Sequence, residues 1–185
     1  NPTRDRLETL IAGLEEGTDA IAFSSGMAAV DAVFHLFSPG DHVILGDDLY
    51  GGSIRLFTNI YEKNGVEFTY VGTSDLDAVQ AAFKPNTKAV YIETPTNPMM
   101  EITDVRALSK MAHDRNALVI VDNTFLSPYF QKPLHLGADI VVHSGTKFIG
   151  GHHDVISGFT IVKDDELAAQ LRLIYKTVGA CLSAF

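Results

Sequence analysis

The feature that most constrains the fold of this chain is an alternation between short apolar runs and longer amphipathic stretches. The apolar runs predict strands at Ala20–Phe23, His42–Leu45, Glu67–Val71, Ala89–Ile92, Leu118–Val121, Ile140–Val142 and Phe159–Val162. Residues 118–121 are apolar at every position, which is typical of a strand covered by helices on both faces. Strands that alternate with helices indicate βαβ units. We therefore predict an α/β fold with one mostly parallel sheet flanked by helices.

The stretches between the runs carry helix signals. Helices are expected over the apolar stripe 7–14 with Gly17 as its stop, after Ser25 through Phe37, from Asp75 through Phe83, and after the capping residue Asp104. A further helix after Tyr50 carries Leu56, Phe57 and Ile60, which we expect in the core rather than in an interface.

The length, net charge and cysteine content of the chain exclude several classes of protein. With 185 residues, 46% hydrophobic, the chain is long enough for one domain with a real core. A net charge of −9 without a basic cluster predicts no nucleic-acid partner, and no apolar run is long enough for a membrane span. The single Cys181 fits a reducing compartment, so we expect a cytoplasmic protein. The chain lacks an initiating Met, and we expect it to be a piece of a longer protein.

In a parallel α/β sheet, ligands bind beyond the carboxyl ends of the strands. Ser24-Ser25-Gly26-Met27 follows the first strand and leads into a helix. The N–H groups of Gly26 and Met27 would point out of the helix N-terminus, which is suited to a phosphate. Taken alone, this segment fits better a helix that is simply capped by Ser25. A nucleophilic serine is a poor interpretation, because the segment does not match Gly-x-Ser-x-Gly.

Two other strand ends carry charged groups. Asp122 follows a buried strand, where a carboxylate is costly unless a cation meets it; the alternatives are a helix cap or a structural ion pair. Lys147 follows another strand, close to Ser144 and Thr146. A partly desolvated lysine beside other positive centres can act as amine nucleophile and base. Most lysines are solvated surface charges, but the neighbouring hydroxyl groups suit a phosphate.

Two rival interpretations compete for this segment. Gly145–Gly150 begins like a P-loop, but Gly151 and His152 stand where the lysine and the Mg²⁺ hydroxyl are needed, which disfavours a nucleotide triphosphatase. Residues 152–154 and His143 offer possible metal ligands, but their spacing would require an irregular loop. We predict no metal site.

An aromatic ring and an amide follow two further strands, Tyr50 and Asn97. Each has an ordinary alternative, packing for Tyr50 and a turn position for Asn97. Together the strand ends supply an anion cradle, a carboxylate, a lysine, an aromatic face and an amide. Pyridoxal 5′-phosphate uses all five, because its phosphate needs the cradle, its aldehyde needs Lys147 and its pyridine nitrogen needs Asp122.

Five motifs occur in order: Ser24–Ala29, Asp48–Gly52, Glu93–Pro98, Asp122–Phe125 and Ser144–Phe148. They resemble the Cys/Met-metabolism (trans-sulfuration) family of pyridoxal-phosphate enzymes, whose fold is of the aspartate-aminotransferase type (fold type I). The resemblance implies that residues 1–185 are the large cofactor-binding domain, with a preceding segment and a small C-terminal domain absent. It also implies a homo-oligomer, a dimer of dimers in the full-length family.

The resemblance also implies roles for single residues. Lys147 would be the Schiff-base lysine and proton shuttle, with its pKa lowered by burial and cationic surroundings. Asp122 would pair with the pyridinium nitrogen, and Tyr50 would stack on the ring and take part in catalysis. The phosphate would be held by Gly26, Met27, Ser144 and Thr146, while Asn97 would bind the ring hydroxyl region and the substrate carboxylate.

The implied substrate is a small sulfur-containing amino acid. We expect a carbon–sulfur lyase of the cystathionine β-lyase type, acting in methionine biosynthesis and converting cystathionine to homocysteine, pyruvate and ammonia. Within the family, the alternatives are cystathionine γ-synthase and γ-lyase. The alternative of another class is a non-catalytic, dimerising scaffold with the same fold.

Overall fold

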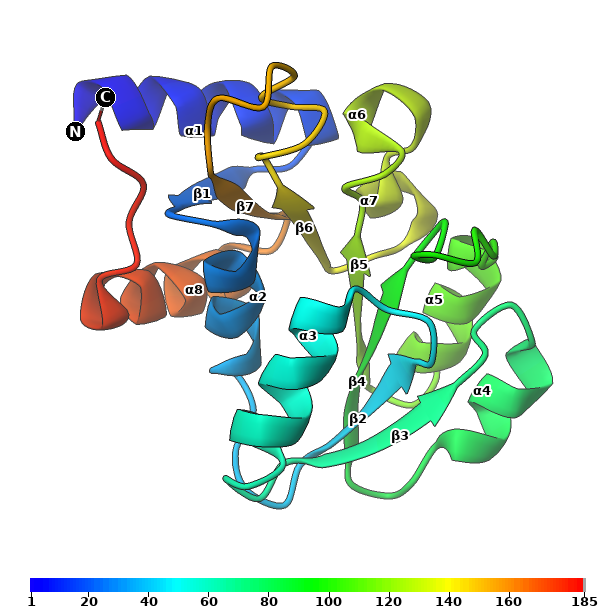
Figure 1. The fold of residues 1–185 in the computed structure, drawn as a ribbon. Coiled ribbons are helices and arrows are strands. Elements are labelled where there is room, and N and C mark those ends of the chain that lie inside the picture. Colours follow the sequence, from blue (N-terminus) through cyan, green and yellow to red (C-terminus); the bar gives the residue numbers. More distant parts are fainter. Residues whose placement is uncertain (185) are drawn as a thin grey trace. The chain divides into compact units, whose positions relative to one another are not determined.

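The computed structural model describes residues 1–184 and divides into two compact units, drawn as a ribbon in Figure 1. Unit 1 contains residues 1–36, 123–134 and those from 139 onward, and unit 2 contains residues 37–122 and 135–138. Each unit has its own buried apolar cluster. The assignment of residues 1–185 to one domain stays a prediction. Within residues 1–184, no helix combines the length and the apolar character needed to cross a bilayer.

Unit 2 is built on four parallel strands, which pair in the order β5-β4-β2-β3. The strands are β2 (His42–Gly46), β3 (Glu67–Val71), β4 (Thr87–Glu93) and β5 (Leu118–Asp122). The helices are α3 (Gly51–Leu56), a π-helical turn η1 (Phe57–Tyr61), α4 (Leu76–Ala82) and α5 (Val105–His113). Parallel strands need crossover connections, and these helices supply them.

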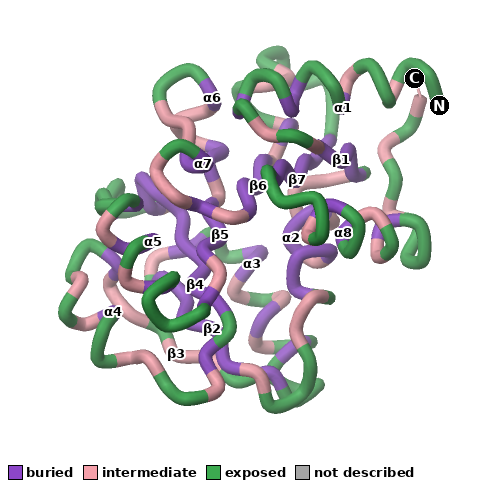
Figure 2. The backbone as a smooth tube through the Cα atoms, turned by 180° about the vertical axis from the view of Figure 1, so that it is seen from behind, coloured by how far each residue is buried: buried purple, intermediate pink, exposed green. Residues whose placement is uncertain are grey.

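Helices cover both faces of these strands. On one face, Val90 packs in a buried cluster with Val79 of α4 and Leu108 of α5. On the other face, the ring of Tyr91 lies 5.5 Å from the ring of Phe57. Val90 and Tyr91 are neighbours in β4, so their side chains point to opposite faces. Figure 2 shows the buried strands in purple.

Unit 1 is built on three strands, with β7 between β1 and β6 and antiparallel to both. The strands are β1 (Asp19–Phe23), β6 (Ile140–Ser144) and β7 (Gly158–Val162). The helices are α1 (Pro2–Glu15), α2 (Gly26–Phe34), α6 (Ser127–Phe130) and α8 (Asp165–Val178), with α7 (Pro133–Leu136) at the sequence boundary between the units. β7 can reverse direction because no crossover helix separates it from β6.

Helices also cover both faces of the strands of unit 1 (Figure 1). On the α1 side, Ile11 packs in a buried cluster with Val141 and Ile161. On the α8 side, the ring of Phe23 meets the ring of Tyr175 edge-on at 5.4 Å. Such an aromatic pair contributes about 1 kcal/mol beyond the apolar area that it buries.

The sequence-based prediction of an α/β fold with mostly parallel strands is confirmed. All seven predicted strands are present, with ends that differ by at most two residues. The antiparallel direction of β7 is the exception to the parallel pattern. Of the residues expected in the core after Tyr50, Phe57 is fully buried, whereas Ile60 is 48% exposed.

Two helix ends differ from the prediction. α2 ends at Phe34 rather than Phe37, four residues before Ser38, whose helical backbone is disfavoured by Pro39. α1 ends in a left-handed residue, Glu16, with φ 59°. Gly17 then passes so close to β7 that a Cβ atom there would lie 2.5 Å from Cγ2 of Ile161.

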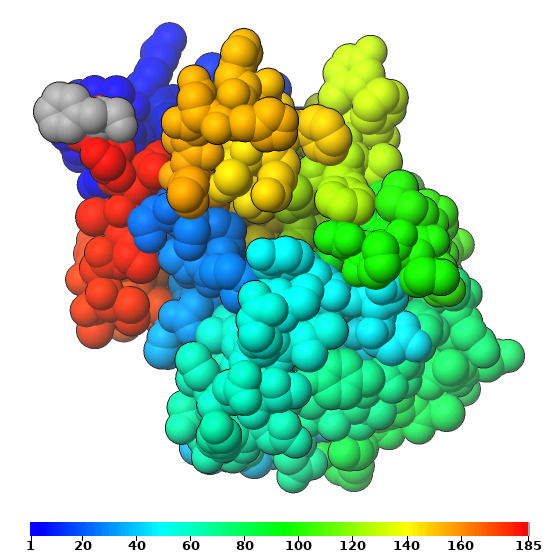
Figure 3. Space-filling view, in the orientation of Figure 1, coloured from blue at the N-terminus to red at the C-terminus, as the bar shows by residue number. Residues whose placement is uncertain are grey.

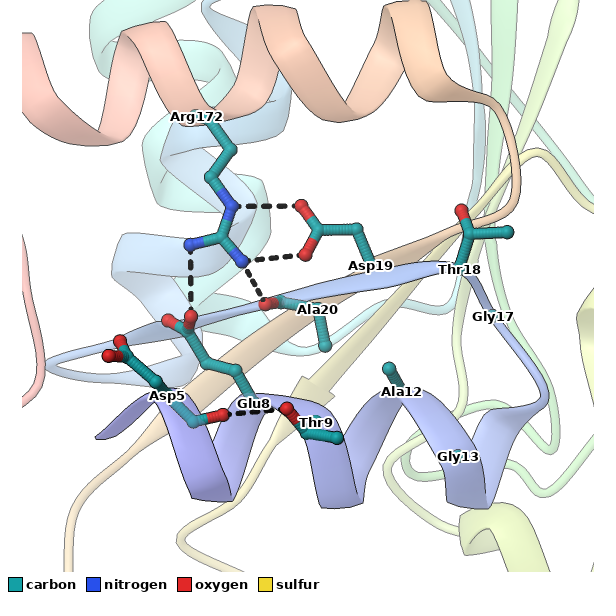
Figure 4. Close-up of a pocket in the computed structure, with 10 residues that line it drawn as sticks. All are labelled: Asp5, Glu8, Thr9, Ala12, Gly13, Gly17, Thr18, Asp19, Ala20 and Arg172. Atoms are coloured by element: carbon teal, nitrogen blue, oxygen red, sulfur yellow. Dashed lines mark hydrogen bonds and ion pairs between the residues drawn. The ribbon is translucent and has the colours of Figure 1, made fainter. Parts of the chain in front are cut away.

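The guanidinium of Arg172 ties α8 to β1 and α1 within unit 1 (Figure 4). Its Nε and Nη2 atoms donate to the two carboxylate oxygens of Asp19, at 2.8 and 2.6 Å. Its Nη1 atom donates to Glu8 at 2.9 Å, and Nη2 also donates to the carbonyl oxygen of Ala20 at 2.8 Å. The hydrogen bonds that Arg172 donates to Asp19 and Glu8 raise its pKa, so the guanidinium stays charged.

The same side chains form hydrogen bonds with backbone groups of β1 on the edge that faces away from β7. The second oxygen of Glu8 accepts the N–H of Ala22 at 2.9 Å. Residues 180–182 continue this cover, since the Leu182 N–H donates to the carbonyl oxygen of Ala22 and the Ser24 N–H to that of Ala180. Backbone groups that lack a neighbouring strand are thus paired with side chains and with an irregular segment.

We predict that Arg172→Met lowers the free energy of unfolding of the full-length protein by about 2–4 kcal/mol, because it leaves the 5% exposed Glu8 without its cationic partner. Urea unfolding followed by circular dichroism measures this change. Arg106→Met, at an exposed position of α5, is the control and should change stability by less than about 0.5 kcal/mol. Equal effects of the two substitutions would contradict the prediction.

Candidate functional site

The first group of predicted site residues lies at the start of α2 in unit 1. Ser25 has an extended backbone and caps the helix, with its Oγ accepting the Ala28 N–H at 3.0 Å. Gly26 and Met27 are the first two helical residues. The N–H groups of a first helical turn carry the positive end of the helix dipole, which favours an anion. The cap and the anion site are therefore compatible, because they use different N–H groups.

The second group follows β6, also in unit 1. Ser144 is the last residue of β6, and its N–H donates to Oγ1 of Thr124 at 2.8 Å. The chain then turns tightly, with the Lys147 N–H donating to the Ser144 carbonyl oxygen at 3.2 Å. The Thr146 hydroxyl lies 3.2 Å from both the N–H and the carbonyl oxygen of Ser157. This turn holds two hydroxyl groups and one amine within four residues.

Lys147 itself is exposed in this chain, so the burial expected for this lysine is not provided by the described residues alone. The residues that follow it are also at the surface, with Phe148 68% exposed and Ile156 66% exposed. Figure 3 shows this part of unit 1 as gold and orange atoms at the surface. Any desolvation of Lys147 must therefore come from a bound ligand or from another part of the protein.

The start of α2 and the end of β6 approach each other within unit 1. A Cβ atom placed on Gly26 would lie 2.8 Å from Cβ and 2.9 Å from Oγ of Ser144. Real Cβ atoms do not approach so closely, so only glycine fits at this position. The close approach brings the helix N-terminus beside a hydroxyl group, a combination of donors that is suited to an anion.

A buried polar cluster supports the end of β6. His143 directly precedes Ser144 and is 1% exposed, and its Nε2 donates to Oε1 of Glu15, which is fully buried, at 2.5 Å. The Asn123 side chain donates to the same oxygen at 2.8 Å and to the Gln131 carbonyl oxygen at 2.9 Å. Sequence reasoning missed this cluster, because Glu15 and His143 are 128 residues apart.

The remaining predicted residues lie in unit 2. Asp122 is the last residue of β5 and pairs in register with Glu93, the last residue of β4. The Tyr91 hydroxyl lies 3.5 Å from Oδ2 of Asp122. Tyr50 precedes α3, is 48% exposed, and donates its N–H to Oε2 of Glu93 at 2.9 Å. Two acids, one exposed ring and one buried phenol therefore gather at the strand ends of this unit.

Asn97 lies in the loop that follows β4 and is partly exposed. The loop is braced by threonine hydroxyls, since Oγ1 of Thr94 accepts the Thr103 N–H at 3.0 Å and Oγ1 of Thr96 accepts the Glu101 N–H at 2.9 Å. Asp48 accepts the Met99 N–H at 2.9 Å and so fixes the loop to the segment after β2. The loop that presents Asn97 is ordered by its own side chains.

Burial and neighbouring acidic groups raise the pKa values of Glu93 and Tyr91 in unit 2. Burial, the Asp122 charge and, to a smaller degree, the Asp48 charge raise the pKa of Glu93 from 4.5 to about 8, against the opposing effect of the Tyr50 N–H. Burial and the charges of Asp122 and Glu93 also hold the pKa of the Tyr91 phenol well above its ordinary value. A buried carboxyl group beside the half-buried Asp122 carboxylate favours a nearby cation.

Among residues 1–184, no three His, Cys, Asp or Glu side chains gather closely enough to hold a metal ion. The side chains of His152, His153 and Asp154 are exposed. The strand-end groups described above are therefore the candidates for chemistry in this part of the chain.

Comparison with known proteins decides the family. The model of the family described as Cys/Met metabolism PLP-dependent enzyme matches residues 1–185. The chain belongs to this family. The resemblance drawn from the five motifs is thereby confirmed, and the cofactor of the family is pyridoxal phosphate.

Individual relatives match all or nearly all of the chain. It is 50% identical to the cystathionine beta-lyase of Lactococcus lactis subsp. cremoris over 182 residues, 98% of this chain and 48% of the relative. It is 47% identical to the cystathionine gamma-synthase/O-acetylhomoserine (thiol)-lyase of Bacillus subtilis (strain 168) over 185 residues, 100% of this chain and 50% of the relative. The chain therefore spans about half the length of the curated relatives it matches.

A solved structure confirms the fold class. The crystal structure of cystathionine gamma-lyase from Lactobacillus plantarum complexed with L-serine matches with a TM-score of 0.99 and 50% identity. The match covers 100% of this chain and 48% of that chain. The residues of this chain also fit the family cofactor: the cradle that excludes a Cβ at Gly26 suits a phosphate, and the acid pair at Asp122 suits a protonated ring nitrogen.

We predict that Gly26→Ala lowers the stability of the full-length protein by about 1–3 kcal/mol, because the new methyl group would overlap Ser144. Phosphate affinity should fall as well, and urea unfolding with and without phosphate measures both. Gly13→Ala, in the last turn of α1 with no atom within 4 Å of the added methyl, is the matched control and should stabilise by about 0.5–1 kcal/mol. Loss of stability in both variants would contradict the explanation.

A second prediction concerns pH. Glu93 binds its proton more tightly in the folded chain than in the unfolded chain, so the free energy of unfolding should decrease as the pH rises from 4.5 to about 8. The slope from this single group is at most about 1.4 kcal/mol per pH unit. The contribution of Glu93 is the difference in unfolding free energy between the wild type and Glu93→Gln, both measured without cofactor. A difference that does not vary between pH 5 and pH 8 would refute the assignment.

Proposed function

We propose that the protein to which this chain belongs is a pyridoxal-phosphate-dependent carbon–sulfur lyase of trans-sulfuration, of the cystathionine β-lyase type. Its reaction converts cystathionine and water to homocysteine, pyruvate and ammonia. The observation that supports the proposal is the close approach of Gly26, at the α2 N-terminus, to Ser144, which stands three residues before Lys147 in the same turn of unit 1. Cystathionine β-lyases at about 50% identity support the choice of substrate.

Pyridoxal phosphate, when bound, supplies an aldehyde that captures an amine and a ring that accepts an electron pair from the substrate. In unit 1, the N–H groups of Gly26 and Met27 and the hydroxyl groups of Ser144 and Thr146 bind the phosphate. The Lys147 amine holds the aldehyde carbon, and after release it moves a proton at the substrate Cα atom.

Residues of unit 2 act on the ring of the cofactor. The Asp122 carboxylate holds a proton on the ring nitrogen, which keeps the ring electron-poor. Tyr50 stacks on the ring with its exposed side chain and assists catalysis. The Asn97 amide binds the ring hydroxyl region and the substrate carboxylate. These assignments follow the family motifs, and each can be tested by substitution.

The γ-synthase and γ-lyase reactions are the alternatives within the family, because relatives of similar identity carry these names. They would use the same cofactor residues. A non-catalytic scaffold is the alternative of another class. The cytoplasmic location and the homotetrameric state stay predictions.

The test is product analysis with the full-length protein and cystathionine. We expect pyruvate and homocysteine in equal amounts, and Lys147→Ala should lower the rate by about 10³-fold or more, because it removes the group that moves the proton. Borohydride should link the cofactor covalently to the peptide that contains Lys147. Lys176→Ala, exposed in the last turn of α8, serves as the control with unchanged rate.

The other products discriminate between the remaining reactions. Formation of 2-oxobutyrate and cysteine would replace the β-lyase assignment by a γ-lyase. Turnover of an activated homoserine ester with cysteine, but not of cystathionine, would indicate a γ-synthase. Cofactor binding without turnover of either substrate would favour the scaffold.

A further inference from the structure

Glu93 has an unusual position for a carboxylate. It ends β4, is 5% exposed, and stands beside Asp122 in the register of the two parallel strands. An ionised carboxylate with so little water is costly unless a cation or several hydrogen-bond donors compensate it. The roles derived from the family motifs leave this residue without a function.

Among the described residues of unit 2, the groups whose charge or phenol is coupled to Glu93 are acidic. They come from three parts of unit 2: Asp122 at the end of β5, Asp48 in the segment after β2, and Tyr91 two residues earlier in β4. Burial among them raises the pKa of Glu93 to about 8. At neutral pH and without a ligand, most molecules therefore carry a proton on Glu93.

Glu93 also holds the backbone of Tyr50. The Tyr50 N–H donates to Oε2 of Glu93 at 2.9 Å, at the point where α3 begins. A hydrogen bond to an ionised carboxylate is roughly twice as strong as one to a neutral acceptor. The charge on Glu93 thus determines how firmly the first residue of this turn, and the ring that it carries, is fixed.

We propose that Glu93 is a positioning residue of the cofactor site that releases a proton when a cation lies against Asp122 and thereby tightens its hold on Tyr50. The inference rests on the proposed function, in which the cation is the protonated ring nitrogen. The cation offsets the negative charge of Asp122, so the proton on Glu93 passes to water and the carboxylate remains. Binding of the cofactor and fixation of the stacking ring are coupled through one acid.

This coupling predicts how the affinity for the cofactor changes with pH. Because cofactor binding releases the Glu93 proton, affinity should rise with pH up to about 8 and then level off. The contribution of this one group is at most about tenfold in affinity per pH unit. Glu93→Gln keeps an oxygen acceptor for the Tyr50 N–H but cannot titrate, so it separates proton release from the hydrogen bond.

The experiment uses the full-length protein freed of cofactor and titrated with pyridoxal 5′-phosphate in a calorimeter at pH 7. Repetition in PIPES and in imidazole buffer, which differ in ionisation enthalpy, gives the number of protons released. We expect the wild type to release about one proton more than Glu93→Gln. Glu101→Gln, an exposed acid in the loop after β4, is the matched control and should behave like the wild type.

Two further measurements test the positioning role. Glu93→Leu removes the acceptor of the Tyr50 N–H, and we expect cofactor dissociation about tenfold faster than from Glu93→Gln. Infrared difference spectra of the wild type need no variant: the carbonyl band of a protonated carboxylic acid should disappear when the cofactor binds. This measurement keeps the proposal testable if a Glu93 variant does not fold.

The outcomes distinguish the two proposals. A wild type that binds cofactor at Lys147, shown by borohydride trapping, but releases as many protons as Glu93→Gln overturns the role of Glu93 alone. Persistence of the carboxylic-acid band after binding overturns it as well. A wild type that binds no cofactor overturns the proposed function, and the role of Glu93 with it.

Discussion

The contact between Glu15 and His143 is the constraint on which the phosphate half of the candidate site depends. It joins the last turn of α1 to the residue before Ser144, and neither side chain is reached by water to any extent. A buried polar group that loses its hydrogen-bond partner typically destabilises a protein by about 1–3 kcal/mol. Asn123 donates to the same oxygen, so three segments meet at one atom. The end of β6 is thereby held in place by α1.

The two units differ in the charge that their strand ends favour. In unit 1, the groups near Gly26 are N–H and hydroxyl donors, which suit an anion. In unit 2, the groups near Asp122 are carboxylates, which suit a cation. Each unit therefore offers its own polar environment, with hydrogen-bond donors in unit 1 and acidic groups in unit 2. The net charge of −9 is compatible with an anion site in unit 1, because backbone N–H groups can bind an anion without a basic side chain.

Local patterns predicted the strands well, because a run such as residues 118–121 is apolar whatever lies around it. They also placed Gly26 and Lys147 at strand ends, where chemistry was expected. The direction of β7 was not predictable, since its pattern is the same for either direction. The exposure of Lys147 was also missed, because burial depends on distant parts of the chain.

The side-chain pairs were out of reach for a related reason. Glu15 and His143 are far apart in sequence, and nothing in either neighbourhood indicates the other. Glu93 belongs to one of the sequence motifs, but the motif does not show that it lies beside Asp122. That neighbourhood follows from the pairing of β4 with β5. What sequence reasoning lacks here is the list of long-range contacts between buried polar groups.

The cover on the outer side of β1 has a consequence for handling the protein. An uncovered strand edge offers its N–H and carbonyl groups to any extended segment, and such edges promote aggregation. Here Glu8 accepts the Ala22 N–H, Arg172 donates to the Ala20 carbonyl oxygen, and residues 180–182 pair with Ala22 and Ser24, so these backbone groups are not open to a second chain. Shortened forms that end before residue 180, or that lose the Arg172 side chain, would expose this edge. We expect such forms to aggregate through this exposed edge even where they fold.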